Sequence, residues 1–247
     1  MLKGELKMPR FFVENPNKQI ITLSKEASNH ISKSLRMKIG ENVTICDGNS
    51  NDYLCKITKI MPDEVVLKVN ACVKNASEPT IRVHLYQALS KGAKFEYIIQ
   101  KAVELGVSEI TPVLTKRCIS RPKEKNIYSR IARYQKISKQ ASQQSGRGKI
   151  PIVNPILSFE EAILQMKNAK LNILFYECGG EKLNNIDIYK YNDISFMIGS
   201  EGGFEIDEVE FAKKKGVLIG SLGKRILRCE TASLCVLSVL MYSTKNL

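Results

Sequence analysis

The stretch Ile198-Gly199-Ser200-Glu201-Gly202-Gly203-Phe204 follows a short apolar run, Ser195–Gly199, that we expect to be a β-strand. A second turn, Gly220-Ser-Leu-Gly-Lys-Arg-Ile-Leu-Arg228, follows another expected strand, Val217–Gly220. Glycine lets the backbone approach a ligand closely. In open α/β sheets, ligands bind at the carboxyl ends of the strands. The two turns therefore predict one ligand site at that edge of a sheet.

Strands and helices alternate through the rest of this region. Further strands are expected at residues 81–85, 110–114 and 172–176, and helices at 95–103, 128–144, 205–215 and 231–242. Such alternation predicts an α/β domain with a mostly parallel sheet.

The first part of the chain has a different pattern. Short strands are expected at residues 19–23, 42–46, 53–61 and 65–73, with one helix at 28–37, and Asp-Gly and Pro-Asp turns separate them. This pattern is typical of a small β-barrel. The polar segment Lys74–Pro79 then marks a boundary, which gives one domain at residues 1–74 and a second at 75–247.

Composition excludes several classes of protein. The 38 Lys and Arg outnumber the 25 Asp and Glu, and the net charge of +13 favours a polyanionic partner such as nucleic acid. The longest apolar stretch, Ala232–Thr244, is shorter than the roughly 20 residues of a membrane span. The N-terminus Met1–Met8 lacks the apolar core of a signal peptide. Seven scattered cysteines without a C-x-x-C pair argue against disulfides and zinc, and two histidines are too few for a His-rich metal site.

Known nucleotide motifs do not match. The late glycine turn lacks G-x-G-x-x-G spacing, and the first strand–helix junction, Gln87–Gly92, contains only one glycine. Another basic region combines the segment Gln143–Lys149 with the preceding helix, which carries Arg130, Arg133, Lys136 and Lys139. It is either a solvated helix face or a contact for nucleic acid.

A series of motifs extends over nearly the whole chain and ends with the two glycine turns. The series is Met8–Phe12, His30–Arg36, Gln100–Val107, Ile110–Pro112, Arg117, Gln144–Arg147, Pro151, Gly199–Phe204 and Leu222–Ala232. Taken together, these motifs resemble the RsmE family of 16S ribosomal RNA uracil-N3 methyltransferases, within the SPOUT superfamily. Residues 1–7 precede the usual start of the family.

The resemblance implies a PUA-like or OB-like β-barrel followed by a trefoil-knotted SPOUT domain that binds S-adenosylmethionine, acts as a cytoplasmic homodimer and needs no metal. The implied cofactor-binding residues are Phe175, Tyr176, Glu177, Ile198, Gly199, Ser200, Glu201, Gly202, Gly203, Leu222, Gly223, Ile226, Leu227, Arg228 and Thr231. The implied RNA-binding residues are Arg10, His30, Arg36, Lys94, Arg117, Arg133 and Arg147. The apolar helix Thr231–Tyr242 is expected against the partner subunit, with Leu240 on the interface side.

The methyl transfer that the resemblance implies has three candidate catalytic residues in this sequence. Uracil N3 carries a proton that must leave, so a base or a group that stabilises the uracil anion is needed. Arg228 is a candidate for stabilising charge on the carbonyl oxygens, and Glu201 and Glu230 are candidates for the base or for structural ion pairs. Two alternatives remain: a ribose 2′-O-methyltransferase of the same fold, and an RNA-binding assembly factor without enzymatic activity.

Overall fold

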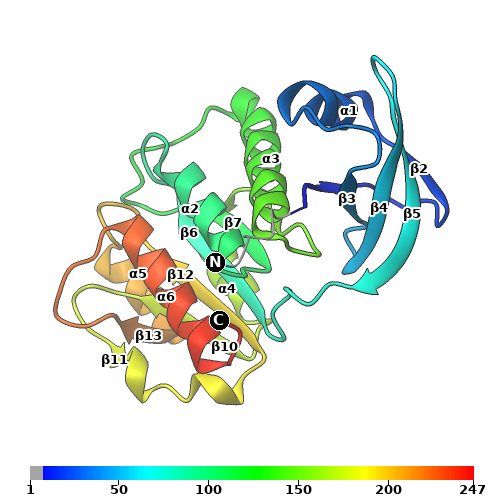
Figure 1. Ribbon diagram of the computed structural model, residues 1–247. Helices are drawn as coiled ribbons and strands as arrows, with labels where there is room; N and C mark the ends of the chain where they lie inside the picture. Colours follow the sequence, from blue (N-terminus) through cyan, green and yellow to red (C-terminus); the bar gives the residue numbers. More distant parts are fainter. Residues whose placement is uncertain (1–7) are drawn as a thin grey trace. The chain divides into compact units, whose positions relative to one another are not determined.

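Separate hydrophobic cores divide the chain into two units in the computed structural model, which describes residues 8–247 (Figure 1). The first unit runs to Glu78 and also contains Ser142–Ile150. The second unit comprises Pro79–Ala141 and Pro151–Leu247. Residues 1–7, on which part of the signal-peptide argument rests, lie outside the described residues.

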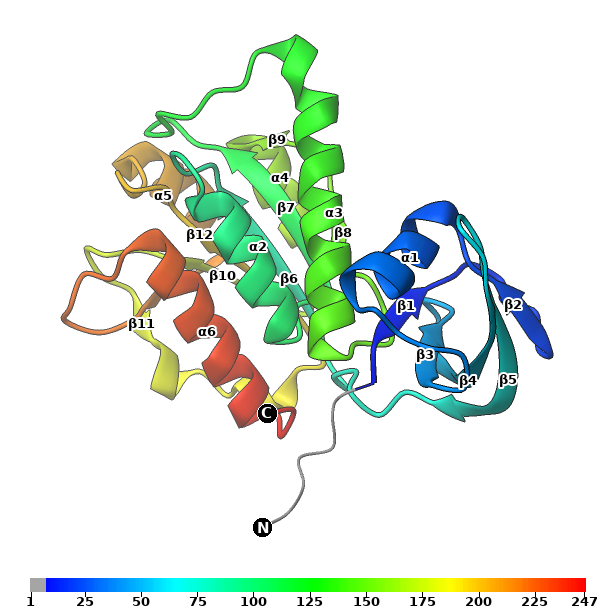
Figure 2. The same cartoon turned by 45° about the horizontal axis from the view of Figure 1, so that its top comes forward.

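The first unit contains a five-stranded sheet and a short helical segment (Figure 2). The order across the sheet is β1 (Arg10–Phe12), β3 (Asn42–Cys46), β4 (Asn51–Ile60), β5 (Val65–Lys74) and β2 (Ile20–Thr22). Only β1 and β3 pair in parallel. Helix α1 (Lys25–Asn29) begins at the cap Ser24 and continues as a π-helix over His30–Ser34, which places Ile31 in the core. The expected strands all form, and β1 is an additional short strand.

The segment Ser142–Ile150 is tied to the first unit by Glu78. The side chain of Arg147 is only 5% exposed, and its Nε and Nη2 donate to the Glu78 carboxylate at 3.2 and 2.8 Å. The backbone N–H groups of Gly148 and Lys149 donate to the same carboxylate. Burial alone would raise the pKa of Glu78, but Arg147 and these N–H groups outweigh it and hold that pKa below its ordinary value. The expected boundary assigned this segment to the second domain, whereas it packs with the first.

Arg10 has a similar structural role. Its guanidinium forms a bidentate pair with Asp52, at 2.6 and 2.7 Å, and also donates to the carbonyl of Arg147. The sequence prediction placed Arg10 and Arg147 among the RNA-binding residues. Both guanidinium groups are largely buried and engaged by carboxylates within the first unit, which gives them a structural role. Their contact with RNA stays a prediction.

The second unit is a parallel sheet with short additional strands. Its order is β11 (Glu181–Lys182), β13 (Leu218–Ser221), β10 (Leu171–Phe175), β12 (Asp193–Ile198), β6 (Arg82–Ala88), β7 (Glu109–Leu114) and β8 (Ile152–Val153), with β9 (Leu157–Ser158) also paired to β7. All these pairs are parallel. Its helices are α2 (Lys94–Glu104), most of α3 (Ile127–Ser145), α4 (Phe159–Met166), α5 (Ile206–Lys214) and α6 (Cys229–Ser243), and short 3-10 turns lie at Glu124–Asn126, Leu183–Asn185 and Ile188–Lys190.

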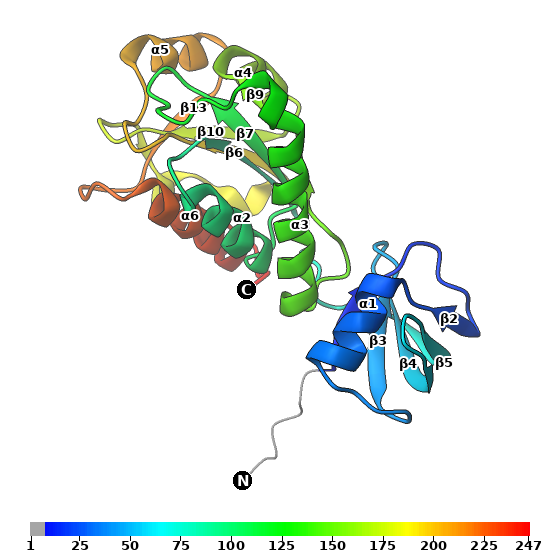
Figure 3. The same cartoon turned by 90° about the horizontal axis from the view of Figure 1, so that it is seen from above.

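The pleat of the strands separates two cores. Val83, Leu85 and Phe196 point to the face that α2 and α6 cover, whereas Tyr86 and Met197 point to the face that α4 and α5 cover. Figure 3 shows these helix pairs on opposite sides of the sheet. Both faces are buried, which is the usual condition of a parallel sheet.

Helix α4 was absent from the sequence prediction although the sequence contains its start signal. Ser158 accepts a hydrogen bond from the N–H of Glu161, and the Glu161 carboxylate accepts one from the N–H of Ser158. This reciprocal pair is a capping box, and Ser followed three residues later by Glu is its sequence signature.

The sequence prediction placed Leu240 of helix α6 on the side that faces a partner subunit, and the structure places it elsewhere. Leu240 is 0% exposed and belongs to the core shared with α2, so a charge placed there would disrupt the fold of a single chain. The outer stripe of α6 instead contains Thr231, Leu234, Cys235, Ser238 and Tyr242. Among residues 8–247, no helix has the length and apolar content needed to cross a membrane.

Replacing Arg147 tests the tie between Glu78 and the segment 142–150. Arg147→Met leaves the Glu78 carboxylate without its cationic partner, and breaking a buried pair costs about 3 kcal/mol. We expect the free energy of unfolding in urea to fall by that amount. Arg133→Met is the matched control, because its pair with Glu96 is exposed and such pairs contribute less than about 1 kcal/mol. Equal losses in the two variants would contradict the structural role of Arg147.

Candidate functional site

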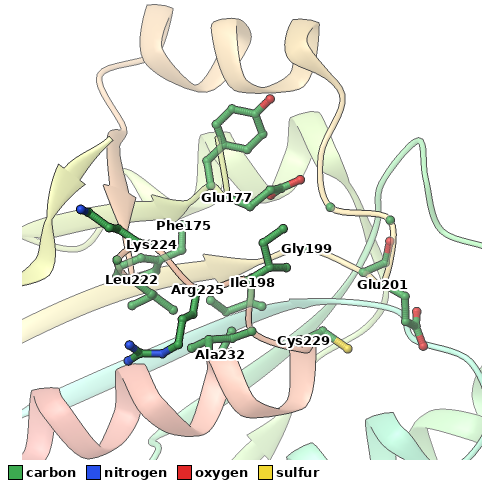
Figure 4. A pocket seen from close by; sticks show the side chains of 17 residues that line it. Phe175, Glu177, Ile198, Gly199, Glu201, Leu222, Lys224, Arg225, Cys229 and Ala232 are labelled. Atoms are coloured by element: carbon green, nitrogen blue, oxygen red, sulfur yellow. The ribbon is translucent and has the colours of Figure 1, made fainter. Parts of the chain in front are cut away.

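A pocket of about 300 Å³ lies where three neighbouring parallel strands end. Strand β10 is followed by Tyr176 and Glu177, strand β12 by the turn Gly199–Gly203, and strand β13 by the segment Leu222–Leu227. The lining residues are Phe175, Tyr176, Glu177, Ile198, Gly199, Ser200, Glu201, Gly202, Gly203, Leu222, Gly223, Lys224, Arg225, Ile226, Leu227, Cys229 and Ala232 (Figure 4). The two glycine turns therefore form opposite parts of one pocket.

The turn after β12 requires glycine at Gly203. Its φ of +69° lies in the left-handed region, and a Cβ there would lie 2.1 Å from Glu177 Oε1. The Glu177 carboxylate therefore lies against the backbone of the turn, on the pocket wall. Phe204, which follows the turn, is buried and packs near Phe159, so the end of the turn is anchored in the core.

Arg117 supports the same turn from the loop after β7. Its Nη1 donates to the carbonyl of Gly202 at 2.8 Å, and its Nε and Nη2 donate to the Glu205 carboxylate at 2.9 and 3.1 Å. The Arg117 carbonyl accepts a hydrogen bond from Ser200 Oγ. Arg117 thus fixes the outer side of the turn while its side chain remains partly exposed.

The second turn and the start of α6 complete the pocket. Gly223 has a φ of +97°, and its N–H donates to Ser221 Oγ. Cys229 and Ala232, one helical turn apart, face the pocket from α6. Burial, followed by the neighbouring Glu230 carboxylate, raises the pKa of the Cys229 thiol to about 12, so this thiol stays protonated at neutral pH.

Glu201 is held in its ionised form at the pocket edge. Its Oε1 accepts hydrogen bonds from the N–H of Lys91 and from Lys94 Nζ, each at 3.1 Å. Burial acts to raise the pKa of Glu201, but backbone N–H groups and Lys94 outweigh it and hold that pKa below its ordinary value. Lys94, an expected RNA contact, is therefore paired with Glu201, a residue that lines the pocket.

Glu230 and Arg228 lie at the start of α6. Burial acts to raise the pKa of Glu230, but its own helix-terminal N–H, the Cys229 thiol and the charges of Lys94 and Arg228 hold it below its ordinary value. Arg228 is the residue before the first turn of α6 and is exposed. Neither residue lines the pocket.

The structure brings together all the expected cofactor-binding residues except Arg228, the exposed residue before α6, and Thr231, on the outer stripe of α6. The sequence prediction did not include Lys224, Arg225, Cys229 and Ala232. Lys224 and Arg225 lie within the predicted turn, between Gly223 and Ile226, so their position in the sequence was enough to predict them as lining residues. Cys229 and Ala232 share the helical spacing of the inward face of α6, which continues to Val236.

The remaining expected RNA contacts are surface residues. His30 and Arg36 are exposed on the first unit, and Phe11 packs edge-on against the His30 ring. Arg133 is exposed on α3 and paired with Glu96. Their exposure leaves these side chains accessible to a large partner.

Comparison with known proteins identifies relatives of both units. A family model described as an RNA methyltransferase domain matches residues 76–241, and one described as an RNA methyltransferase PUA domain matches residues 23–70. The chain is 31% identical to ribosomal RNA small subunit methyltransferase E of Bacillus subtilis, over 97% of this chain and 98% of the relative. Identity to the protein of the same name from Mesomycoplasma hyopneumoniae is 33%, over 94% and 98%.

A solved structure shows the same fold. It is ribosomal RNA small subunit methyltransferase E from Neisseria gonorrhoeae bound to S-adenosyl methionine, with a TM-score of 0.89 and 32% identity over 96% of this chain and 98% of that one. The expected fold class, a trefoil-knotted SPOUT methyltransferase domain preceded by a small PUA-like β-barrel, is thereby confirmed.

Proposed function

The chain belongs to the family of ribosomal RNA small subunit methyltransferases E, and we propose on that basis that it transfers a methyl group from S-adenosyl-L-methionine to N3 of a uridine in 16S ribosomal RNA. The observation that carries the proposal is the pocket formed by the two glycine turns at the ends of β10, β12 and β13.

The residues of this pocket fit the cofactor. Backbone groups of the two turns are available to hydrogen-bond its adenosine and amino-acid parts, and Phe175, Ile198 and Leu222 supply apolar walls. The carboxylates of Glu177 and Glu201 suit its positive charge. When bound, the cofactor supplies a methyl group activated by a sulfonium. The protein then has to bind, orient and exclude water.

Removal of the proton from uracil N3 requires a group on this chain that acts as a base or stabilises the uracil anion. Arg228 is exposed beside the pocket, and we infer that it stabilises negative charge on the carbonyl oxygens of the uracil. The pKa values of Glu201 and Glu230 both lie below the ordinary value of a glutamate. An efficient general base, in contrast, has a pKa near the working pH. This favours a positioning role for both carboxylates.

The RNA substrate accounts for the charge of the protein. A net charge of +13 and a PUA-type first unit suit a phosphate-rich partner. We assign the contacts to His30, Arg36, Lys94, Arg117 and Arg133. Because the proposed substrate is ribosomal, we propose that the protein works in the cytoplasm.

The outer stripe of α6 supports a homodimer. Leu234 and Cys235 are partly exposed on this helix, and Tyr242 is 77% exposed. We propose that this stripe packs against a second copy of the chain, in place of the face that contains Leu240.

The cofactor assignment is tested by calorimetry with S-adenosylmethionine. We expect the native chain to bind and Gly199→Val and Gly223→Val to lose binding while remaining folded. A Cβ at Gly199 would crowd Gly203 and Phe204, and Gly223 has a φ that side chains rarely adopt. Gly48→Val is the control, because Gly48 has a positive φ in the first unit. A native chain that fails to bind would favour an assembly factor.

The position of methylation is determined by mass spectrometry of the product nucleosides. N3-methyluridine is the expected product, and 2′-O-methyluridine would identify a ribose methyltransferase instead.

Measurements of kcat distinguish the roles of the three charged residues Arg228, Glu201 and Glu230. Arg228→Met should lower kcat about 100-fold, the effect of removing one donor to a developing oxyanion, without weakening cofactor binding. Glu201→Gln and Glu230→Gln should each lower kcat less than tenfold, since loss of a general base costs about 100-fold or more. A 100-fold loss in either glutamate variant would identify that residue as the base.

The dimer is tested on the exposed stripe. Leu234→Glu should shift the protein from dimer to monomer in sedimentation velocity, because an unpaired carboxylate in an interface costs several kcal/mol. The exposed control Tyr189→Glu lies outside this stripe and should leave the sedimentation coefficient unchanged. A native chain that sediments as a monomer would refute the homodimer.

A further inference from the structure

Strand β6 contains, near its C-terminal end, a buried amide that does not line the pocket. Gln87 is 0% exposed, lies one residue before the end of β6, and stands beside Ile198 in the parallel register of β6 and β12. Its sequence context, Gln87–Gly92, showed no known nucleotide motif. A buried side-chain amide has to satisfy its two donors and its acceptor within the protein.

The partners of Gln87 come from two other segments. Its Nε2 donates toward the carbonyls of Ile198 at 3.5 Å and Gly199 at 3.3 Å, and toward that of Ala88 at 3.2 Å. Its Oε1 accepts a hydrogen bond from Ser233 Oγ on α6, and Ser233 Oγ also lies 2.8 Å from the carbonyl of Cys229. Carbonyls on one side and a hydroxyl on the other fix the orientation of the amide, because only its NH₂ group can serve the carbonyls.

Both partner segments line the pocket, whereas Gln87 does not. Ile198 and Gly199 form the start of the first glycine turn, and Cys229 is the pocket residue at the start of α6. Gln87 therefore joins the turn to the helix from the neighbouring strand β6. Removing its side chain would leave the carbonyls of Ile198 and Gly199 without this donor and Ser233 without this acceptor.

The same junction holds the turn at a second point. The N–H of Lys91 and the ammonium of Lys94 both donate to Glu201, two residues after Gly199. The β6–α2 region thus contacts the turn twice: Gln87 bonds to its first carbonyls, and Lys91 and Lys94 bond to the Glu201 carboxylate.

We propose that Gln87 is a positioning residue for the cofactor pocket, which sets the Ile198–Gly199 backbone against the start of α6 without touching the ligand. This inference rests on the proposed function, because it takes S-adenosylmethionine as the ligand of that pocket. It goes beyond the pocket residues by assigning the geometry of the pocket to a buried amide on a neighbouring strand.

The main test is Gln87→Met, which conserves side-chain size and removes the hydrogen bonds. We expect calorimetry to show at least about tenfold weaker binding of S-adenosylmethionine. In steady-state assays the KM for the cofactor should rise by a similar factor, while the KM for RNA stays unchanged.

Thr111→Val is the matched control for stability. Thr111 is also fully buried, and its Oγ1 bonds to His84 and Asn154 among residues outside the pocket lining. This variant should lower the thermal midpoint as Gln87→Met does and retain native cofactor affinity. A general loss of stability would move the midpoints of both variants, but it would not weaken cofactor binding in only one of them.

Ser233→Ala provides an independent variant, which removes the hydroxyl that orients the Gln87 amide. We expect a smaller loss of cofactor affinity, and a loss in the double variant that is less than the sum of the single losses. If Gln87→Met fails to fold, native affinity in folded Ser233→Ala overturns the inference. Native affinity in folded Gln87→Met overturns it directly. Failure of the native chain to bind S-adenosylmethionine instead overturns the proposed function.

Discussion

The pocket depends on one constraint of parallel sheets, which is that neighbouring strands end at the same edge. Strands β13, β10 and β12 lie side by side, although β13 follows β12 in the sequence and is separated from it by α5. The chain therefore leaves β12, passes through α5, adds β13 on the far side of β10, and returns through Leu222–Leu227 to α6. Because of this path, pocket residues as far apart as Phe175 and Ala232 meet at the carboxyl edge of the sheet.

Strong local signals made most of the second unit predictable from the sequence. The glycine turns indicated where strands end, and helical spacing gave α2, α3, α5 and α6 to within a few residues. The pocket lining followed from the same signals together with the family resemblance. The sequence gives no comparable signal for the short strands β8 and β9, which contain two residues each and show no measurable alternation.

Pairwise electrostatics could not be predicted in the same way. Arg147 pairs with Glu78, which lies 69 residues earlier, and Arg10 pairs with Asp52, 42 residues later. Nothing in the local sequence distinguishes these arginines from exposed Arg36 or Arg133. Leu240 shows the equivalent limit for apolar residues, because a helix that is apolar on several sides does not reveal which side faces its own core. Gln87 was overlooked for a related reason: its partners come from strand ends and a helix more than 100 residues away.

The first unit takes up Ser142–Ile150 from the middle of the chain, so neither unit is a single continuous piece of sequence. During synthesis the ribosome releases residues 8–78 long before residue 147. Until then Glu78 has no guanidinium to bind, and the Cys46 thiol has no Gly148 carbonyl to which it can donate. The apolar core of this unit comes from residues 11–69 alone, so it is synthesised before these polar contacts can form. A gene fragment that ends near residue 78 therefore carries the core of the unit but lacks these partners of Glu78 and Cys46, and recombination that transplants the unit would have to replace them.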